Sequence, residues 1–440
     1  MNFRIIAYIV GWVCNFQAAF MMLPLLTAGI YREKDFSAFL LAMLVCLVVG
    51  VPLTRKKPKN KVFYIKDGCV AVALSWLALC IFGAIPFVVS GCIPHPIDAL
   101  FETVSGFTTT GSSILSDVEV LPHCILIWRS FTHWIGGMGV LVFLLSLLPL
   151  AGGYHMNLMK AESPGPSVSK LVPKVQSTAK ILYTIYFGMT LIQLALLLIG
   201  RVPLFDSLCI TFGTAGTGGF GIVNDSLGSY STYCQVVTTI FMILFGVNFS
   251  AYYLILTKKF RQAFKYEEVR YYFGIIAVAI MIIALNTAHL FRNLLTAFQQ
   301  AAFQVGSIIT TTGFSSTDFN QWPALSKTVL VLLMFVGACA GSTGGGIKVS
   351  RILILCKAAK KEFQLYLHPN AVKKIKMDDK VITHDILRST NIYISLYLMI
   401  FAASVLLIAI DNFDLITNFM AVTATLNNVG PGFEIVGPMG

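Results

Sequence analysis

Uninterrupted apolar runs of about 20 residues recur along this chain, and each is long enough to cross the hydrocarbon core of a bilayer as an α-helix. Of the 440 residues, 56% are hydrophobic and only 12% are charged, whereas a soluble domain carries about 25% charged residues. The first run, Ile5–Ile30, is too long for a secretory signal peptide. The sequence therefore predicts an all-α polytopic membrane protein that lies in a lipid bilayer.

Nine of these runs are predicted to span the membrane: Ile5–Leu26, Ser37–Leu53, Cys69–Val89, Ile125–Leu150, Ala179–Ile199, Tyr233–Thr257, Tyr271–Ala288, Lys327–Cys356 and His384–Ile410. Shorter or more polar segments lie between some of them: Pro96–Thr110, Pro203–Thr217, Arg292–Thr312 and Asp411–Asn428. Each short segment ends in a glycine signal. We expect each to dip into the membrane and return to its own side, beside protein or a water-filled cavity.

Basic residues gather in four loops: Arg55–Lys66, Lys160–Lys180, Lys258–Arg270 and Lys357–Lys380. If every short segment returns to its own side, these loops share one face, and Lys and Arg mark the cytoplasmic face. The N-terminus is then cytoplasmic, and the net charge of +12 reflects topology. Nucleic acid is not expected as a partner, because its binding would need one basic face with interleaved aromatic residues.

Motifs of nucleotide-binding enzymes occur in the wrong context. The sequence GTGGFG at Gly216–Gly221 matches GxGxxG but lies among apolar helices rather than in a βαβ unit. The stretch Gly341–Ser350 resembles a P-loop, but Ile347 stands where lysine is required and Lys348 comes one residue late. The ten cysteines occur singly, without a CxxC pair. We therefore expect no enzyme, no resident metal site and no covalently bound cofactor.

The four short segments end in similar phrases, which indicates an internal repeat. The phrases are TTTG at Thr108–Gly111, AGTG at Ala215–Gly218, TTTG at Thr310–Gly313 and NNVG at Asn427–Gly430. Each repeat comprises a span, a dipping segment, a glycine and a second span, so all four have the same orientation. The predicted organisation is a two-helix extension over 1–65 and pore repeats over 66–152, 178–258, 270–365 and 384–440, arranged around one pseudo-fourfold pore.

Four parallel repeats can each bring one extended strand to a shared axis. Glycine permits the positive φ that turns a carbonyl inward, and rings of carbonyls replace the hydration shell of an ion. One Thr-Gly pair alone would be an ordinary turn, but four at matched positions favour a selectivity filter. The candidate filter residues are Thr109, Thr110, Gly111, Thr217, Gly218, Thr311, Thr312, Gly313, Asn428, Val429 and Gly430. A hard cation is expected at the backbone, with threonine hydroxyls as further ligands, at Thr110, Gly111, Thr217, Gly218, Thr312, Gly313, Val429 and Gly430.

The apolar run Lys327–Cys356 is interrupted by GACAGSTGGG, which should unwind the helix at membrane depth. Broken helices line binding sites or gates in transporters, so we expect a flexible plug beneath the filter. The alternative is close helix packing through small residues. The candidate gate residues are Gly341, Ser342, Thr343, Gly344, Gly345, Gly346 and Lys348. Lys348 either extends towards the membrane interface or contributes to the charge balance of the gate.

Other polar residues have two interpretations. Asp98, Glu102 and Asp206 lie on the dipping segments, where acids are functional candidates, although helix capping is favoured for Asp98 and Asp206. Asn248, midway along a predicted span, is expected to make an interhelical hydrogen bond, and His133 is expected to pack. Acids that follow the filter phrases either concentrate cations at the pore mouth or are solvated loop charges: Asp117, Glu119, Asp225, Asp318 and Glu434.

Several motifs resemble the Trk/Ktr/HKT potassium-transporter superfamily, and within it the TrkH-type translocating subunit. They are HWIGGMGVLVF at His133–Phe143, AESPGP at Ala161–Pro166, GSTGGGIKVSR at Gly341–Arg351 and NNVGPGFE at Asn427–Glu434. The resemblance implies that the key filter glycines match Gly111, Gly218, Gly313 and Gly430. In plant relatives a serine at the first of these accompanies sodium transport, so four glycines imply potassium as the transported ligand. It also implies a homodimer with one pore per subunit, a glycine-rich gate, and a cytosolic TrkA-type ring of nucleotide-binding regulatory subunits.

Two transport functions remain open at this point. The first is channel-like potassium uptake across the cytoplasmic (inner) membrane of a prokaryote, driven by a membrane potential worth about 2.3 kcal/mol per charge per 100 mV. The alternative is a secondary symporter that couples potassium or sodium to a second ion. Such a carrier would favour inverted repeats, whereas the repeats here are parallel.

The chain ends ten residues after Gly430, with PGFEIVGPMG. A span needs about 20 residues, so the second span of the fourth repeat is missing from this sequence. In the family that helix carries a basic residue that meets the glycine-rich gate. We expect this sequence to be a C-terminal truncation of a longer protein.

Overall fold

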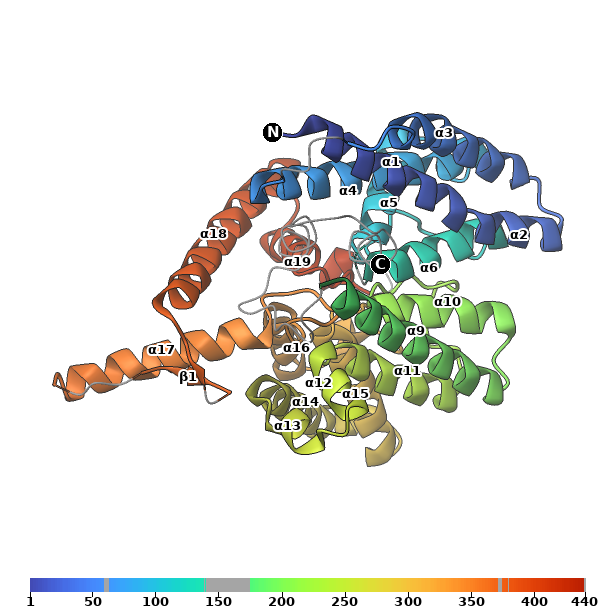
Figure 1. Ribbon diagram of the computed structural model, residues 1–440. Coiled ribbons are helices and arrows are strands. Elements are labelled where there is room, and N and C mark those ends of the chain that lie inside the picture. Colours follow the sequence, from blue (N-terminus) through green and yellow to red (C-terminus); the bar gives the residue numbers. More distant parts are fainter. Residues whose placement is uncertain (59–62, 138, 140–174, 371–373, 379, 439–440) are drawn as a thin grey trace. The chain divides into compact units, whose positions relative to one another are not determined.

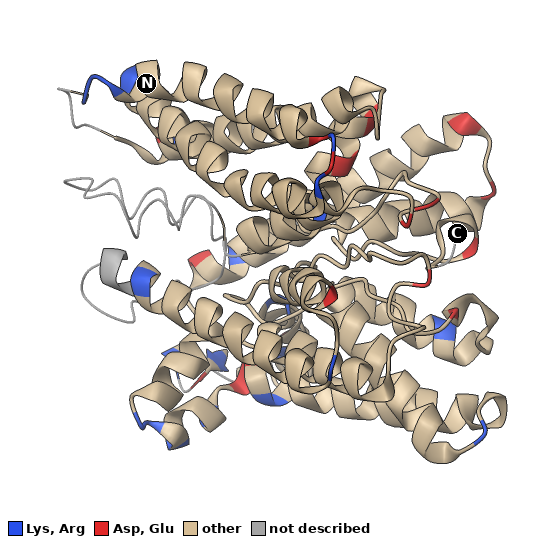
Figure 2. Ribbon diagram, turned by 90° about the vertical axis from the view of Figure 1, so that its right-hand side faces the viewer, with Lys and Arg blue, Asp and Glu red and all other residues tan. Residues whose placement is uncertain are grey.

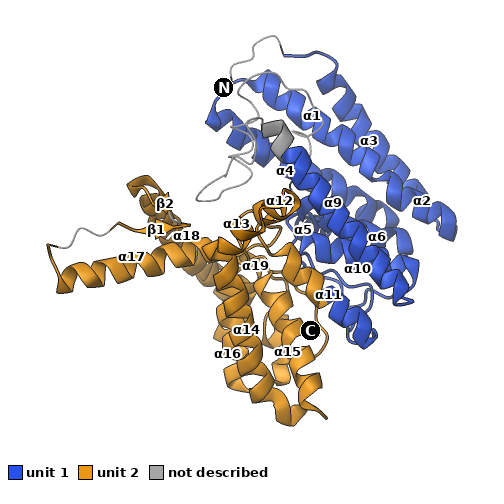
Figure 3. Ribbon diagram, turned by 60° about the horizontal axis from the view of Figure 1, so that its bottom comes forward, with its two compact units in different colours: residues 1–164, 168–238 blue, residues 165–167, 239–440 orange. Residues whose placement is uncertain are grey.

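The computed structural model describes residues 1–58, 63–137, 139, 175–370, 374–378 and 380–438. Helices make up almost all of its regular structure (Figure 1). The chain divides into two compact units, which are distinguished by colour in Figure 3. The first unit comprises Met1–Pro164 and Val168–Thr238, and the second comprises Gly165–Ser167 and Thr239–Gly440. Each is described separately below.

The first unit contains long helices and two short pore helices. In chain order its elements are α1 (Phe3–Phe20), α2 (Met22–Tyr31), α3 (Phe36–Thr54), α4 (Ile65–Ser90), α5 (Pro96–Phe107), α6 (His123–Gly137), α9 (Val175–Ile199), α10 (Leu204–Gly216) and the first half of α11 (Thr232–Phe245). The pore helix α5 packs against α4 and α6, and the pore helix α10 packs against α6 and α9. Helix α6 therefore contacts both pore helices of this unit.

The second unit repeats this scheme. After the second half of α11 its elements are α12 (Phe249–Leu256), α13 (Phe260–Lys265), α14 (Glu267–Thr287), η1 (Ala288–Leu290), α15 (Leu294–Ile309), η2 (Phe319–Gln321), α16 (Ala324–Val336), α17 (Val349–Leu367), β1 (Lys376–Met377), β2 (Lys380–Val381), α18 (His384–Ile408), η3 (Ala409–Asp411), α19 (Leu415–Leu426) and η4 (Glu434–Val436). The strands form an antiparallel pair, with Lys376 opposite Val381 and Met377 opposite Lys380. The pore helix α15 packs against α14 and α16, and the pore helix α19 packs against α16 and α18.

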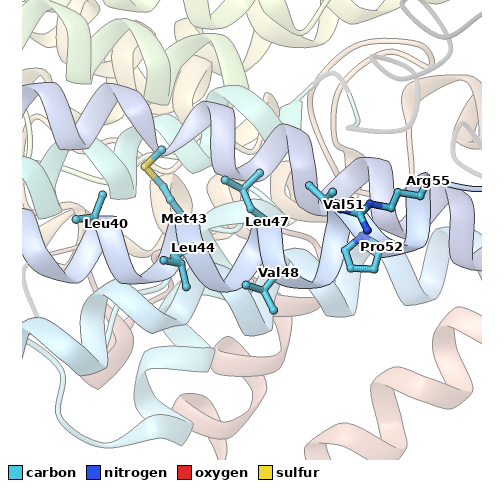
Figure 4. Close-up of a pocket in the computed structure, with 8 residues that line it drawn as sticks. All are labelled: Leu40, Met43, Leu44, Leu47, Val48, Val51, Pro52 and Arg55. Carbon is cyan, nitrogen blue, oxygen red and sulfur yellow. The ribbon is translucent and has the colours of Figure 1, made fainter.

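Six segments in the described part of the chain are long and apolar enough to cross a membrane unbroken: Phe3–Tyr31, Phe36–Thr54, Ile65–Ser90, Ala179–Ile199, Glu267–Leu290 and His384–Asp411. They match six of the nine predicted spans. Their middles carry few charged residues, which gather at helix ends and in loops (Figure 2). The outer face of α3 shows what such a span exposes: a shallow groove lined by Leu40, Met43, Leu44, Leu47, Val48, Val51, Pro52 and Arg55 (Figure 4).

Two other predicted spans are broken. Lys327–Cys356 unwinds between Val336 and Val349, as its glycines predict. The prediction of one continuous span over Tyr233–Thr257 is wrong, because α11 and α12 meet at an angle of 93°. Gly246 lies at this break, where an added Cβ would come within 2.8 Å of the Thr310 side chain.

The sequence suggested that Asn248 lies midway along a span. In the structure it lies at the same break. Its side chain caps α12 by accepting a hydrogen bond from the Ser250 N–H at 2.9 Å. It also interacts with the carboxylate of Glu268 on α14, so the expected interhelical contact is present. The one remaining predicted span is Ile125–Leu150, of which the structure describes only the part up to Gly137 and the isolated Gly139. The motif Ala161–Pro166 also lies outside the described residues.

Candidate functional site: paired glycine loops and a broken helix

All four pore helices end in the same backbone motif. The residue that follows the helix, or comes second after it, adopts a left-handed conformation, with φ of +61° at Thr109, +55° at Thr217, +58° at Thr311 and +64° at Asn428. The next amide donates a hydrogen bond five residues back: Thr110 to Ser105, Gly218 to Gly213, Thr312 to Ser307 and Val429 to Ala424, at 2.8–2.9 Å. This is the Schellman helix end, which usually has glycine at the left-handed position.

Three of the four left-handed residues are threonines. A β-branched residue with positive φ is a conformational outlier, and such outliers persist only where the surroundings impose them, most often at functional sites. All three threonines are buried. The outlier therefore recurs at three of the four helix ends, and the fourth has Asn428, a residue type that adopts positive φ more readily.

The shared motif fixes the register of the four loops and corrects one predicted glycine. Two residues after the left-handed position, the glycines have φ of +82° at Gly111, +78° at Gly219, +86° at Gly313 and +92° at Gly430. In the second loop the equivalent residue is therefore Gly219, and not Gly218. Gly218 instead matches Thr110, Thr312 and Val429, one residue earlier. The prediction aligned Gly218, the first glycine of a Gly-Gly pair, with the other loop glycines. In the structure the second glycine, Gly219, has the matching positive φ.

The loops meet in two pairs, and both pairs have the same geometry. In the first unit a Cβ added to Gly111 would overlap the carbonyl oxygen of Gly218. In the second unit a Cβ added to Gly313 would overlap the carbonyl oxygen of Val429. Gly218 and Val429 occupy the same register position, so each contact joins the glycine of one loop to the preceding carbonyl of its partner loop. This agreement supports the corrected register independently of the dihedral angles.

The threonine hydroxyls of the first and third loops bond within their own loops. The hydroxyl oxygens of Thr108 and Thr110 are 2.8 Å apart, and those of Thr310 and Thr312 are 2.7 Å apart. Thr108 also donates to the Val104 carbonyl at 2.6 Å. These contacts stabilise the helix end, so the backbone carbonyls are the better candidates for ion ligands than the hydroxyls that the sequence also suggested.

His133 on α6 supports both loops of the first unit. Its Nε2 accepts a hydrogen bond from the Phe220 amide at 3.3 Å, so the proton lies on Nδ1, which donates to the Gly106 carbonyl at 2.9 Å. The ring also lies where a Cβ on Gly218 would be. Gly136 and Gly137 lie against Phe107 and Gly216, where their missing side chains allow α6 to approach both loops. The packing role predicted for His133 is therefore confirmed, and its hydrogen bonds are with the backbone of α5 and of the second loop.

Arg129 lies one turn before His133 and is not among the residues predicted from the sequence. Its Nε donates to Glu102 Oε1 at 2.8 Å, and its other nitrogens donate to the Ser113 hydroxyl at 3.1 Å and the Gly221 carbonyl at 3.2 Å. Both charged side chains are almost completely buried, with exposed fractions of 2% and 0%. Arg129 thus ties the first loop, through Ser113, to the second loop, through Gly221. A lone arginine within an apolar run was the available signal, because intramembrane charges are functional candidates by default.

The remaining acids lie at helix ends and in loops. Asp98 and Asp206 are in the first turns of α5 and α10, where a carboxylate complements the helix dipole, and Asp206 accepts from the Tyr230 hydroxyl at 2.9 Å. The residues that follow the filter phrases make hydrogen bonds within or between the loops, through the side chains of the four acids before Glu434 and through the backbone amide of Glu434. Asp117 and Glu119 both bind Asn224, at 2.9 and 3.0 Å, while Asp225 accepts from Ser229, Asp318 accepts from the Asn320 amide, and the Glu434 amide donates to Asn320.

The predicted gate residues lie against the two loops of the second unit. The Gly345 amide donates to the Thr311 hydroxyl at 2.5 Å. A Cβ added to Gly344 would come within 2.7 Å of the Thr310 carbonyl oxygen, and one added to Gly345 would come within 2.7 Å of the Asn428 Cβ. The Lys348 side chain donates to the Gly344 carbonyl and so links the end of the broken segment back to its middle.

Comparison with known proteins gives consistent results. The TrkH family, described as "Cation transport protein", matches residues 35–434. The Trk system potassium uptake protein TrkH of Salmonella typhimurium is 36% identical over 99% of this chain and 92% of its own length. Its Escherichia coli K12 counterpart is 35% identical with the same coverage. The crystal structure of the potassium transporter TrkH from Vibrio parahaemolyticus superposes with a TM-score of 0.89 at 30% identity, covering 99% of this chain and 92% of the other.

Proposed function

This chain belongs to the TrkH family of cation transport proteins, and from this premise we propose that it takes up potassium through a filter built from its four glycine-containing loops. The family consists of transporters, so the chain is a multi-pass membrane transporter and not an enzyme. Potassium is then the transported ligand. The relatives that carry the name of a potassium uptake protein match nearly the whole chain, which supports the same cargo here.

The observation that carries the proposal is the repeated helix end. Each loop presents a left-handed residue, a following carbonyl and a glycine with positive φ, and the loops meet in two equivalent pairs. The proposed filter glycines are Gly111, Gly219, Gly313 and Gly430. The proposed ion ligands are the backbone carbonyls around Thr110, Gly218, Thr312 and Val429, because rows of carbonyls replace the hydration shell of a potassium ion.

The surroundings of the pore are part of the same proposal. We propose that the chain is organised as the two-helix extension and the four repeats predicted from the sequence. It would lie in the inner membrane with its N-terminus on the cytoplasmic side. The basic clusters support that orientation, because Lys and Arg accumulate on the cytoplasmic side. A homodimer and a cytosolic TrkA-type nucleotide-binding ring are proposed from the family resemblance. Expression of the full-length protein should restore growth of a potassium-uptake-deficient bacterium at low potassium, and failure to do so in membranes that contain the protein would contradict the proposal.

Coupled symport is the second candidate, and the parallel repeats argue against it. The two mechanisms differ in what sets the reversal potential of the purified protein in a planar bilayer. With a fixed potassium gradient, a potassium pore should keep the same reversal potential when a proton or sodium gradient is added. A reversal potential that moves with the second gradient would favour the coupled carrier.

We also propose that Gly341–Gly346 is the gate, because it fills the space against Thr310, Thr311 and Asn428. Gly344→Ala should raise potassium flux without a cytosolic partner by about tenfold. The added methyl group overpacks the closed arrangement against the Thr310 carbonyl, and overpacking costs about 1–3 kcal/mol. Tracer potassium uptake into proteoliposomes measures the effect.

The matched control for this prediction is Gly274→Ala on α14, where an added Cβ meets nothing within 4 Å. This control should leave the flux unchanged. Equal fluxes for wild type and Gly344→Ala would reduce the broken segment to a packing element.

A further inference from the structure

Glu268 is a buried acid that the proposed filter and gate do not yet use. It is the second residue of α14 and only 3% exposed. One of its carboxylate oxygens, Oε1, accepts hydrogen bonds from two backbone amides, Ala340 at 2.6 Å and Ser350 at 3.1 Å. Ala340 immediately precedes the glycine-rich segment, and Ser350 lies just after Lys348 in the first turn of α17. A single oxygen atom therefore joins both ends of the proposed gate.

The position suits a charged acceptor. The first N–H groups of a helix have no partner within the helix, and they carry the positive end of its dipole. Ser350 is the second residue of α17, a helix of 19 residues, so Glu268 acts as its N-terminal cap from another helix. Lys348 is also near enough to Glu268 to interact with it electrostatically. The carboxylate thus stabilises the start of α17, which begins at Val349, directly after the unwound segment.

The same carboxylate contacts the other broken helix. Asn248, at the break between α11 and α12, interacts with Glu268 through its side chain. The two breaks are joined by backbone hydrogen bonds as well: Phe249 N–H to the Gly341 carbonyl at 3.0 Å and Cys339 N–H to the Gly246 carbonyl at 3.0 Å. The unwound segments of α11–α12 and α16–α17 therefore form one hydrogen-bonded unit, with Glu268 between them.

We infer that Glu268 is a positioning residue that holds the glycine-rich segment in its closed arrangement by tying both of its ends to α14. The inference rests on the proposed gating role of Gly341–Gly346. If the segment moves as a whole away from Thr311, Ala340 and Ser350 move with it and lose their hydrogen bonds to the carboxylate. Hydrogen bonds to a charged acceptor are stronger than those to a neutral one, so the charge of Glu268 favours the closed state.

Glu268→Gln keeps the shape of the side chain and removes its charge. Potassium flux through proteoliposomes without a cytosolic partner should rise about tenfold, as expected when charge-assisted hydrogen bonds are weakened. The matched control is Glu267→Gln, the same change one residue earlier. Glu267 pairs with Lys357, and its side chain is 26% exposed, whereas Glu268 is only 3% exposed. The potassium flux of Glu267→Gln should stay at the wild-type value. Both variants should keep the wild-type preference for potassium over sodium.

Deletion of Gly341–Gly346 separates the two claims. If Glu268 acts through this segment, the deletion should raise the flux, and Glu268→Gln should add nothing in the deleted background. A flux increase from the deletion but none from Glu268→Gln would overturn the inference and leave the gate in place. An unchanged flux after the deletion would remove the gating proposal and the inference with it. Should Glu268→Gln fail to accumulate in membranes, Glu268→Asp tests the same point, because the shortened side chain cannot reach both amides and should raise the flux by a smaller factor.

Discussion

Gly111→Ser should lower the preference of this transporter for potassium over sodium by about tenfold or more. Gly111 has a φ of +82°, and holding a non-glycine residue in a sparsely populated region costs about 1–3 kcal/mol. The new Cβ would also overlap the carbonyl oxygen of Gly218, so that carbonyl must move. Because ion selection depends on the carbonyl positions, the loss should appear in the potassium-to-sodium permeability ratio obtained from reversal potentials.

Gly313→Ser should give a similar loss, since its Cβ would overlap the carbonyl oxygen of Val429 in the equivalent pair. Gly91→Ser provides a matched control. Gly91 has a φ of +77°, close to the +82° of Gly111, but an added Cβ there meets nothing within 4 Å. The control should therefore retain wild-type selectivity. Unchanged permeability ratios in both Gly111→Ser and Gly313→Ser would exclude these glycines from the filter.

Arg129→Gln and Glu102→Gln should each destabilise the protein strongly, while the double substitution should be milder than the sum of the two. Each single change leaves one buried charge without its partner, and breaking a buried pair in this way costs about 3–5 kcal/mol. The double variant leaves two neutral side chains able to hydrogen-bond. Thermal unfolding of the detergent-solubilised protein and potassium uptake should both follow this order.

The pair Lys357–Glu267 supplies the control, because both of its side chains are 26% exposed. Contact with solvent weakens an ion pair, and pairs at the surface contribute about 0–1 kcal/mol. Lys357→Gln should therefore shift the unfolding temperature less than Arg129→Gln, whose pair is 2% and 0% exposed. Equal losses from Arg129→Gln and Lys357→Gln, or strict additivity in the Arg129 and Glu102 cycle, would show that the buried pair does not act as a unit.

The third repeat has a neutral residue where the first has the buried Glu102, so the repeat does not require a charge at this position. In the shared register Gln304 occupies the position of Glu102, seven residues before the left-handed threonine. Its amide donates to the Ser316 hydroxyl and the Thr317 carbonyl, each at 3.4 Å. A neutral network thus supports the third loop where an ion pair supports the first. The second and fourth repeats have Ile210 and Ala421 at this position.

The repeated phrases allowed much of the fold and the site to be predicted. Four apolar segments too short to span the membrane, each ending in glycine, predicted the four pore helices. The unwinding before Val349 followed from the glycines themselves. These features depend on local backbone preference, which the sequence shows directly.

The features that could not be predicted depend on tertiary contacts. Gly218 and Gly219 are chemically identical neighbours, and only the helix end at Thr217 determines which one takes the positive φ. The break after Phe245 contains one glycine and no proline, and Gly246 there packs closely against Tyr272 and Thr310, where an added Cβ would overlap the Tyr272 hydroxyl and come within 2.8 Å of the Thr310 side chain. The Arg129–Glu102 pair joins residues 27 positions apart. Neither residue alone therefore indicated that Arg129 connects the first loop to the second.

The most direct test of the central claim, a potassium filter of four glycine loops, is the reversal potential of the purified wild-type protein with potassium on one side of a planar bilayer and sodium on the other. The account predicts a reversal potential close to that of a potassium-selective pore, and a shift towards zero in Gly111→Ser and Gly313→Ser but not in Gly91→Ser. A wild-type reversal potential near zero, with a measurable current, would contradict it.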